Sequence, residues 1–150
     1  MRLFLGFSVD TVLFAALSKR VATCLGGQEV ALVPAANAHM TLHFLGEVAS
    51  QDVGVIKSNC SQIAAVTPAF TLDIKQLTLF RRRKQSLLVA LTNMPLPLAK
   101  LYAQVAESLN AAGFSTDTRS YRPHITLSRQ AKAVEMLTAP LSGQLPVSEL

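Results

Sequence analysis

The sequence predicts a mixed fold of strands and helices, built as two similar lobes with a cleft between them. The main observation is an internal repeat, because the chain resembles itself at an offset of 85 residues, the separation of His39 and His124. Each half contains an apolar strand, a helix, and then a strand that opens with His-x-Thr-Leu. The second observation is composition: 50% of the 150 residues are hydrophobic and 15% are charged, which is enough apolar surface for a packed core.

Local patterns place five elements in the first half, bounded by capping residues, glycines and prolines. They are a strand over 3–7, a helix capped by Asp10 and ended by Gly26-Gly27, a strand over 39–45 closed by Gly46, a helix capped by Ser50 and stopped by Pro68, and a strand over 70–75. Because the run 3–7 is continuously apolar, we expect this strand to be covered on both faces.

The second half shows a similar series. It consists of a hairpin formed by 77–80 and 86–91, a helix that begins at Pro95 to Pro97 and ends at Gly113, and a final strand over 124–128. The hairpin loop carries Arg81-Arg82-Arg83-Lys84, the densest charge in the sequence. Two interpretations stay open for this loop: a binding site for the phosphates of a polyanionic ligand, or a solvated turn.

The two His-x-Thr motifs predict a site for a tetrahedral anion. Side chains two apart on a strand share a face, so His39 and Thr41 point one way and the apolar residues between them the other. The same holds for His124 and Thr126. Two such strands facing each other would offer two imidazoles and two hydroxyls to one phosphate. Histidine can act as acid or base near neutral pH, and threonine hydroxyls can donate to phosphate oxygens.

Each histidine could instead pack or cap within its sheet. A matching Thr-Leu after both histidines, at equivalent places of the repeat, favours the functional interpretation. His43 follows Thr41 by two residues, so the alternation places it on the same face. It is expected either to line the mouth of the cleft and contact a substrate or to be an ordinary surface histidine.

The net charge and the cysteine content indicate which class of partner and which cellular compartment to expect. A formal net charge of +5 suits a polyanionic or phosphorylated partner. Cys24 and Cys60 show neither a paired framework nor metal-ligand spacing, which favours a reduced, cytoplasmic protein. No stretch approaches the roughly 18 uninterrupted apolar residues of a membrane span, and Asp10 interrupts the apolar start, so we expect no membrane association or signal peptide.

The segments His39–Gly46 and Arg122–Arg129 resemble the paired signatures of the two-histidine phosphoesterase superfamily. The resemblance is nearest to the LigT-like branch, the RNA 2′,3′-cyclic phosphodiesterases also called 2′-5′ RNA ligases. It implies an α+β, bilobal fold with two pseudo-twofold-related lobes of antiparallel sheet, outer helices and a central cleft. It further implies one domain over residues 1–150, without a C-terminal strand segment that the family usually carries.

The resemblance also implies an activity and a set of residues. The activity is metal-independent hydrolysis of RNA 2′,3′-cyclic phosphodiester ends to 2′-phosphomonoesters, by a monomer that needs no cofactor. His39 is expected to be the proton donor and His124 the proton acceptor. Substrate-binding residues are expected at Thr41, Thr126, Arg129 and His43. The alternatives are 2′-5′ RNA ligation, action on another cyclic or 2′-5′ phosphoester, or a non-catalytic module that binds RNA ends.

Overall fold

The structure is a computed structural model that describes residues 1–135 and 138–150. The described strands form one open antiparallel sheet with the order β1-β2-β5-β4-β3-β6. The strands are β1 (Arg2–Ser8), β2 (His39–Glu47), β3 (Phe70–Arg81), β4 (Ser86–Thr92), β5 (His124–Ser128) and β6 (Ala139–Val147). The helices are α1 (Thr11–Cys24), α2 (Val53–Ala65) and α3 (Leu96–Ala111), with short 3-10 turns at Ala35–Asn37 and Ser50–Asp52. The predicted α+β, two-lobed architecture is confirmed.

The sequence repeat is also a structural repeat. Helices α1 and α3 begin at Thr11 and Leu96, and strands β2 and β5 begin at His39 and His124, so both pairs keep the 85-residue offset. The pairs β1-β2 and β5-β4 lie symmetrically about the boundary between β2 and β5. The local twofold axis therefore passes between β2 and β5, the two strands that carry the His-x-Thr motifs.

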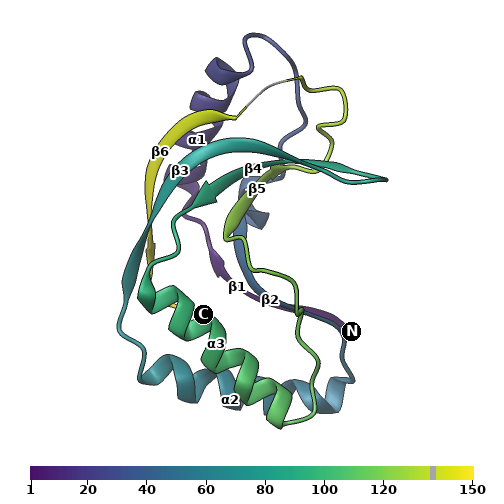
Figure 1. The fold of residues 1–150 in the computed structure, drawn as a ribbon, viewed down its shortest axis with the longest axis vertical. Helices are drawn as coiled ribbons and strands as arrows, with labels where there is room; N and C mark the ends of the chain where they lie inside the picture. Colours follow the sequence, from purple (N-terminus) through teal and green to yellow (C-terminus); the bar gives the residue numbers. More distant parts are fainter. Residues whose placement is uncertain (136–137) are drawn as a thin grey trace.

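The helices cover the sheet at its two ends. Asp10 caps α1 as expected, because its carboxylate Oδ1 accepts hydrogen bonds from the backbone N–H groups of Val12 (2.7 Å) and Leu13 (3.2 Å). Helix α1 packs on β6, whereas α2 and α3 lie side by side below the other end of the sheet (Figure 1). The apolar faces of β2 and β5 meet this helical layer, and Met40, Leu42, Ile125 and Leu127 are each at most 2% exposed.

Four features of the fold differ from the expectations. Strand β1 is an edge strand and the side chain of Phe4 is 47% exposed, so the expectation of cover on both faces was wrong. Helix α2 begins only at Val53, because the residues from Ser50 first form a 3-10 turn. The two strands expected over 70–75 and 77–80 are one continuous strand, β3. Strand β6 was not expected at all; it pairs with β3 and forms the other edge of the sheet.

Candidate active site

The two His-x-Thr motifs lie on neighbouring antiparallel strands. Met40 of β2 pairs with Ile125 of β5, so the flanking positions oppose each other crosswise: His39 faces Thr126, and Thr41 faces His124. Met40 and Ile125 are fully buried against the helices, so the histidines and threonines point to the opposite face. The two histidines are diagonal neighbours on adjacent strands, which places their Cα atoms about 7–8 Å apart.

Two hollows open on this face of the sheet, where one cleft was expected. Thr41 and His124 line one of them, and His39 and Thr126 line the other, together with Arg129. The hollows adjoin, because these four side chains are nearest neighbours on the paired strands β2 and β5. Each hollow thus combines an imidazole of one motif with the hydroxyl of the other.

Both imidazoles are held in the same way. The Nδ1 atom of His39 lies 2.7 Å from the carbonyl oxygen of Asn37, and that of His124 lies 2.6 Å from the carbonyl oxygen of Arg122. A carbonyl oxygen only accepts, so Nδ1 carries the proton in both rings. Among the described residues, no hydrogen bond engages the Nε2 atom of either ring, so this atom is available to a ligand. Because the acceptor is two residues upstream in both cases, the repeat extends to the groups that orient the rings.

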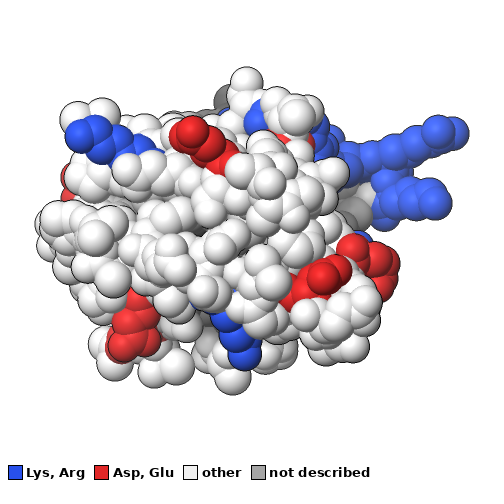
Figure 2. All heavy atoms as spheres, turned by 90° about the horizontal axis from the view of Figure 1, so that it is seen from below, with Lys and Arg blue, Asp and Glu red and all other residues white. Residues whose placement is uncertain are grey.

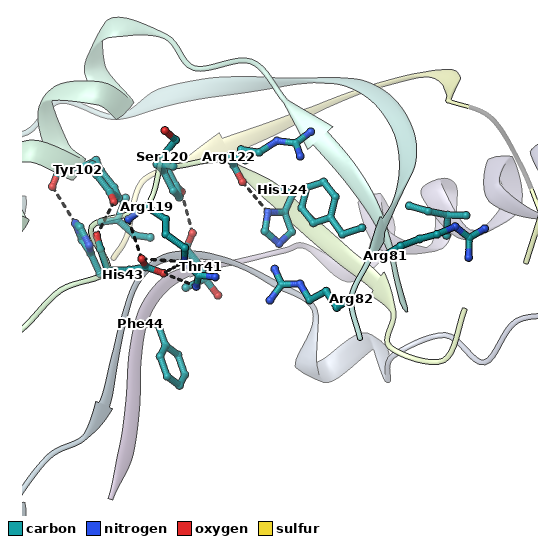
Figure 3. Close-up of a pocket in the computed structure, with 15 residues that line it drawn as sticks. Thr41, His43, Phe44, Arg81, Arg82, Tyr102, Arg119, Ser120, Arg122 and His124 are labelled. Atoms are coloured by element: carbon teal, nitrogen blue, oxygen red, sulfur yellow. Dashed lines mark hydrogen bonds and ion pairs between the residues drawn. The ribbon is translucent and has the colours of Figure 1, made fainter. Parts of the chain in front are cut away.

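Arginines surround His124 more closely than the sequence indicated. Burial lowers the pKa of His124, and the positive charges of Arg82, Arg122 and Arg129 lower it further, against the hydrogen bond to the Arg122 carbonyl that raises it. Phe80 meets the ring edge-on, with centroids 5.0 Å apart. Figure 3 shows Arg82 turned from the β3–β4 hairpin towards the hollow, whereas Arg81 points away from it. The neutral form of His124 is therefore favoured near neutral pH.

The ring of His39 stacks face to face on an aromatic side chain. Phe4 of β1 stacks on His39 with centroids 4.5 Å apart and planes inclined by 27°. Next to it on the same hollow is Gly6, which pairs with Thr41 and allows β1 to approach β2 closely. A Cβ atom at Gly6 would lie 2.6 Å from the carbonyl oxygen of Met40, so this approach depends on the absence of a side chain.

His43 lies at the wall of the hollow that contains Thr41 and His124, but it is buried. The pairing of β1 with β2 shifts between Leu5–His43 and Gly6–Thr41, so Leu42 is an extra residue that breaks the alternation. As a result His43 is only 2% exposed; it stacks on Tyr102 of α3 (centroids 4.1 Å apart), and its Nε2 donates to the Tyr102 carbonyl oxygen at 2.9 Å. The expectation of a surface histidine was wrong, and we assign this ring to holding α3 against the sheet. Burial lowers its pKa.

The segment before β5 supplies further groups at this site. Tyr121 stacks on Tyr102 and donates from its hydroxyl to the carbonyl oxygen of Thr41 at 2.8 Å, which fixes the backbone beside that hydroxyl. Arg119 and Asp117 form an ion pair on the wall of the hollow, and hydrogen bonds from Arg119 lower the pKa of Asp117 to about 2. The proximity of these side chains depends on a loop path that no local sequence pattern predicts.

Among residues 1–135 and 138–150, no three His, Cys, Asp or Glu side chains lie close enough together to bind a metal ion. Within the same residues, none of the helices combines the length and apolar character needed to cross a bilayer.

Comparison with known proteins identifies the family. The sequence model of the 2′-5′ RNA ligase superfamily matches residues 14–148, so the chain belongs to this superfamily, as the two motifs indicated. It is 32% identical over 95 residues to an RNA 2′,3′-cyclic phosphodiesterase of Thermotoga maritima, a match that covers 62% of this chain and 50% of the relative. A protein of the same name from Bacillus subtilis is 28% identical over 93 residues, covering 61% and 51%. The chain spans about half the length of the curated relatives it matches.

Solved structures agree with the fold. E. coli LigT in its apo form superimposes with a TM-score of 0.76 at 26% identity, over 97% of this chain and 82% of that one. A Thermus thermophilus protein, TT0787, gives a TM-score of 0.80 over 98% of this chain and 84% of that one. Its 21% identity supports the likeness of fold alone.

Proposed function

We propose that this protein hydrolyses 2′,3′-cyclic phosphate ends of RNA to 2′-phosphomonoesters, without a metal ion. The observation that carries the proposal is the crosswise pair of imidazoles and hydroxyls on β2 and β5, with both Nε2 atoms left to face a ligand. Membership of the superfamily and the names of the two curated relatives support the same reaction.

In the proposed reaction the phosphorus lies between the two rings. Neutral His124 takes a proton from water through Nε2 as the water oxygen bonds to phosphorus. The bond from phosphorus to the 3′ oxygen breaks, and the Nε2–H of protonated His39 supplies the proton that this oxygen needs. The products are a 2′-phosphate and a free 3′ hydroxyl, and the two histidines have exchanged protonation states. A diagonal separation of about 7–8 Å leaves room for a phosphorus centre between the rings.

The assignment of His124 as the base rests on its surroundings. The cations around it and its burial lower its pKa, so it is neutral and able to accept a proton under conditions where an unperturbed histidine is partly charged. His39 has Phe4 as its ring neighbour and its hollow contains Arg129 as a cation. In the proposed site Thr41, Thr126 and Arg129 bind the phosphate oxygens, and Arg82 joins them as a second cation.

The test is turnover of a 2′,3′-cyclic mononucleotide by the purified protein, with and without EDTA, followed by phosphorus NMR of the product. We expect full activity in EDTA, a 2′-phosphate product, and losses of about 10²- to 10⁴-fold in His39→Gln and His124→Gln. Lys57→Ala, an exposed change on α2, is the control. Formation of a 3′-phosphate would contradict the assigned roles, and binding without turnover would favour a non-catalytic module that binds RNA ends.

We further propose a cytoplasmic monomer whose partner is an RNA end. Two free cysteines, the exposed Cys24 and the buried Cys60, are compatible with a reducing compartment. Light scattering coupled to size-exclusion chromatography gives the oligomeric state, and the mass of a dimer would contradict the proposed monomer.

A further inference from the structure

The β3–β4 hairpin carries an isolated group of cations beside the site. Its tip, Arg83-Lys84, is closed by a hydrogen bond of 2.9 Å from the Arg82 backbone N–H to the Gln85 carbonyl oxygen. All residues from Arg81 to Gln85 are exposed. Figure 1 shows the hairpin projecting beyond the rest of the sheet, and on that side Figure 2 shows Lys and Arg side chains extending from the body of the molecule.

Among the described residues, no acidic side chain forms an ion pair with this group, and only the charge of Asp117 acts on Arg82 from a longer distance. In the part of the chain that the structure describes, the ion pairs join the N-terminus to Glu47 and Arg119 to Asp117, and neither includes a hairpin residue. Arg81 has a structural contact, because its Nη2 donates to the carbonyl oxygen of Val134 at 2.9 Å. This hydrogen bond fixes the base of the hairpin, so the tip Arg83-Lys84 projects from the sheet (Figure 1).

The cations form a path from the tip to the site. Arg82 lines the hollow of Thr41 and His124 and is turned towards it in Figure 3, and the tip residues continue outwards from there. On another wall of the same hollow, Arg119 is already paired with Asp117. A polyanion with one end bound in the hollow can therefore place its next charged groups beside the cations of the hairpin tip.

We propose that the hairpin tip Arg83-Lys84 binds the phosphates of single-stranded RNA immediately upstream of the cyclic end, so that the preferred substrates are oligonucleotides rather than cyclic mononucleotides. This inference rests on the proposed function. The contact is electrostatic and independent of base sequence, as in other single-strand grooves.

The experiment compares Arg83→Ala/Lys84→Ala with a matched control, Lys57→Ala/Lys100→Ala, which removes two exposed cations from α2 and α3. Each protein is assayed with a 2′,3′-cyclic mononucleotide and with a 12-nucleotide RNA that ends in a cyclic phosphate. In the hairpin variant we expect kcat/KM to fall about two- to twentyfold for the RNA, since exposed ion pairs are individually weak, and to stay unchanged for the mononucleotide. The control should change neither value.

Binding is measured separately by fluorescence anisotropy with a 12-nucleotide RNA that ends in a 3′-phosphate and is not turned over. Loss of two phosphate contacts should reduce the slope of log K against log salt by about 1.4. Wild-type affinity and slope in the hairpin variant would overturn the proposal, as would equal losses on both kinetic substrates. If the tip instead binds lipid, the variant will lose binding to vesicles of phosphatidylcholine and phosphatidylglycerol but not to RNA, which also overturns it. If no protein turns over a cyclic substrate but the hairpin variant still binds RNA more weakly than the wild type, the proposed reaction is refuted. The proposed contact between the hairpin tip and RNA then stands.

Discussion

Replacement of Gly6 by alanine tests how closely β1 must approach β2 beneath the site. A Cβ atom at Gly6 would lie 2.6 Å from the carbonyl oxygen of Met40 and 3.4 Å from the Cα of Thr41, both backbone atoms of β2. Real Cβ atoms essentially never come within 3.0 Å of a heavy atom outside their own residue and its chain neighbours. Because the atom they would meet is backbone, no rotamer change relieves the clash and the strands must separate. The strands that separate are β1 and β2, at the position where Gly6 pairs with Thr41 of the first His-x-Thr motif.

We expect Gly6→Ala to lower the free energy of unfolding by about 1–3 kcal/mol, the usual cost of forcing extra volume into a packed region. Activity should fall about tenfold or more, because a shift of β1 moves Phe4 off the ring of His39 and moves Thr41 relative to the phosphate. Urea unfolding followed by circular dichroism gives the stability, and turnover of a cyclic mononucleotide gives the activity.

Gly54→Ala is the matched control, because Gly54 lies on the exposed side of α2 and its Cβ would meet nothing within 4 Å. This change should stabilise the protein by about 0.5–1 kcal/mol, since alanine favours a helix, and leave turnover unaltered. If Gly6→Ala unfolds at the wild-type urea concentration with wild-type activity, the close approach of the two strands has no role in holding the site.

Three further predictions concern charge and hydrogen bonding at the site. Arg82→Ala removes a cation that lowers the pKa of His124, so the acid limb of kcat/KM should move to higher pH; an unmoved limb argues against His124 as the base. Burial lowers the pKa of His43 in the folded state, so its contribution to stability is complete above the unfolded value of 6.5 and is lost as pH falls below it. His43→Phe should therefore lose less unfolding free energy between pH 7.5 and 5.5 in urea titrations, and an identical loss would contradict this. Thr41→Val and Thr126→Val should each reduce kcat/KM about ten- to hundredfold, the value of one hydrogen bond to a charged group; near-wild-type kinetics would exclude these hydroxyls from the phosphate site.

The sequence predicted what depends on periodicity. The offset between His39 and His124 matched the starts of α1 and α3 as well as those of β2 and β5, because helical and strand periods survive in both halves. The apolar residues between histidine and threonine indicated the buried face of each strand, and burial of Met40 and Ile125 agrees. Those two facts were enough to place both imidazoles on one face.

What the sequence could not predict depends on departures from regular geometry. The extra residue Leu42 left His43 buried at the wall of the hollow instead of exposed on the surface, and a bulge has no reliable local signal. Strand β6 was missed because Pro140, Gly143 and Pro146 interrupt it; prolines are tolerated there since β6 is an edge strand. The direction in which Arg82 points depends on how the hairpin is braced, which is a tertiary property.

The crosswise register of β2 and β5 makes the two halves of this chain mutually dependent. Each half contributes one imidazole, yet the hydroxyl beside that imidazole comes from its counterpart, and helix α3 of the second half is hydrogen-bonded to β2 of the first. Neither half by itself contains both imidazoles of the proposed catalytic pair. The proposed activity therefore requires both halves of the chain, and separation of β2 from β5 should abolish it.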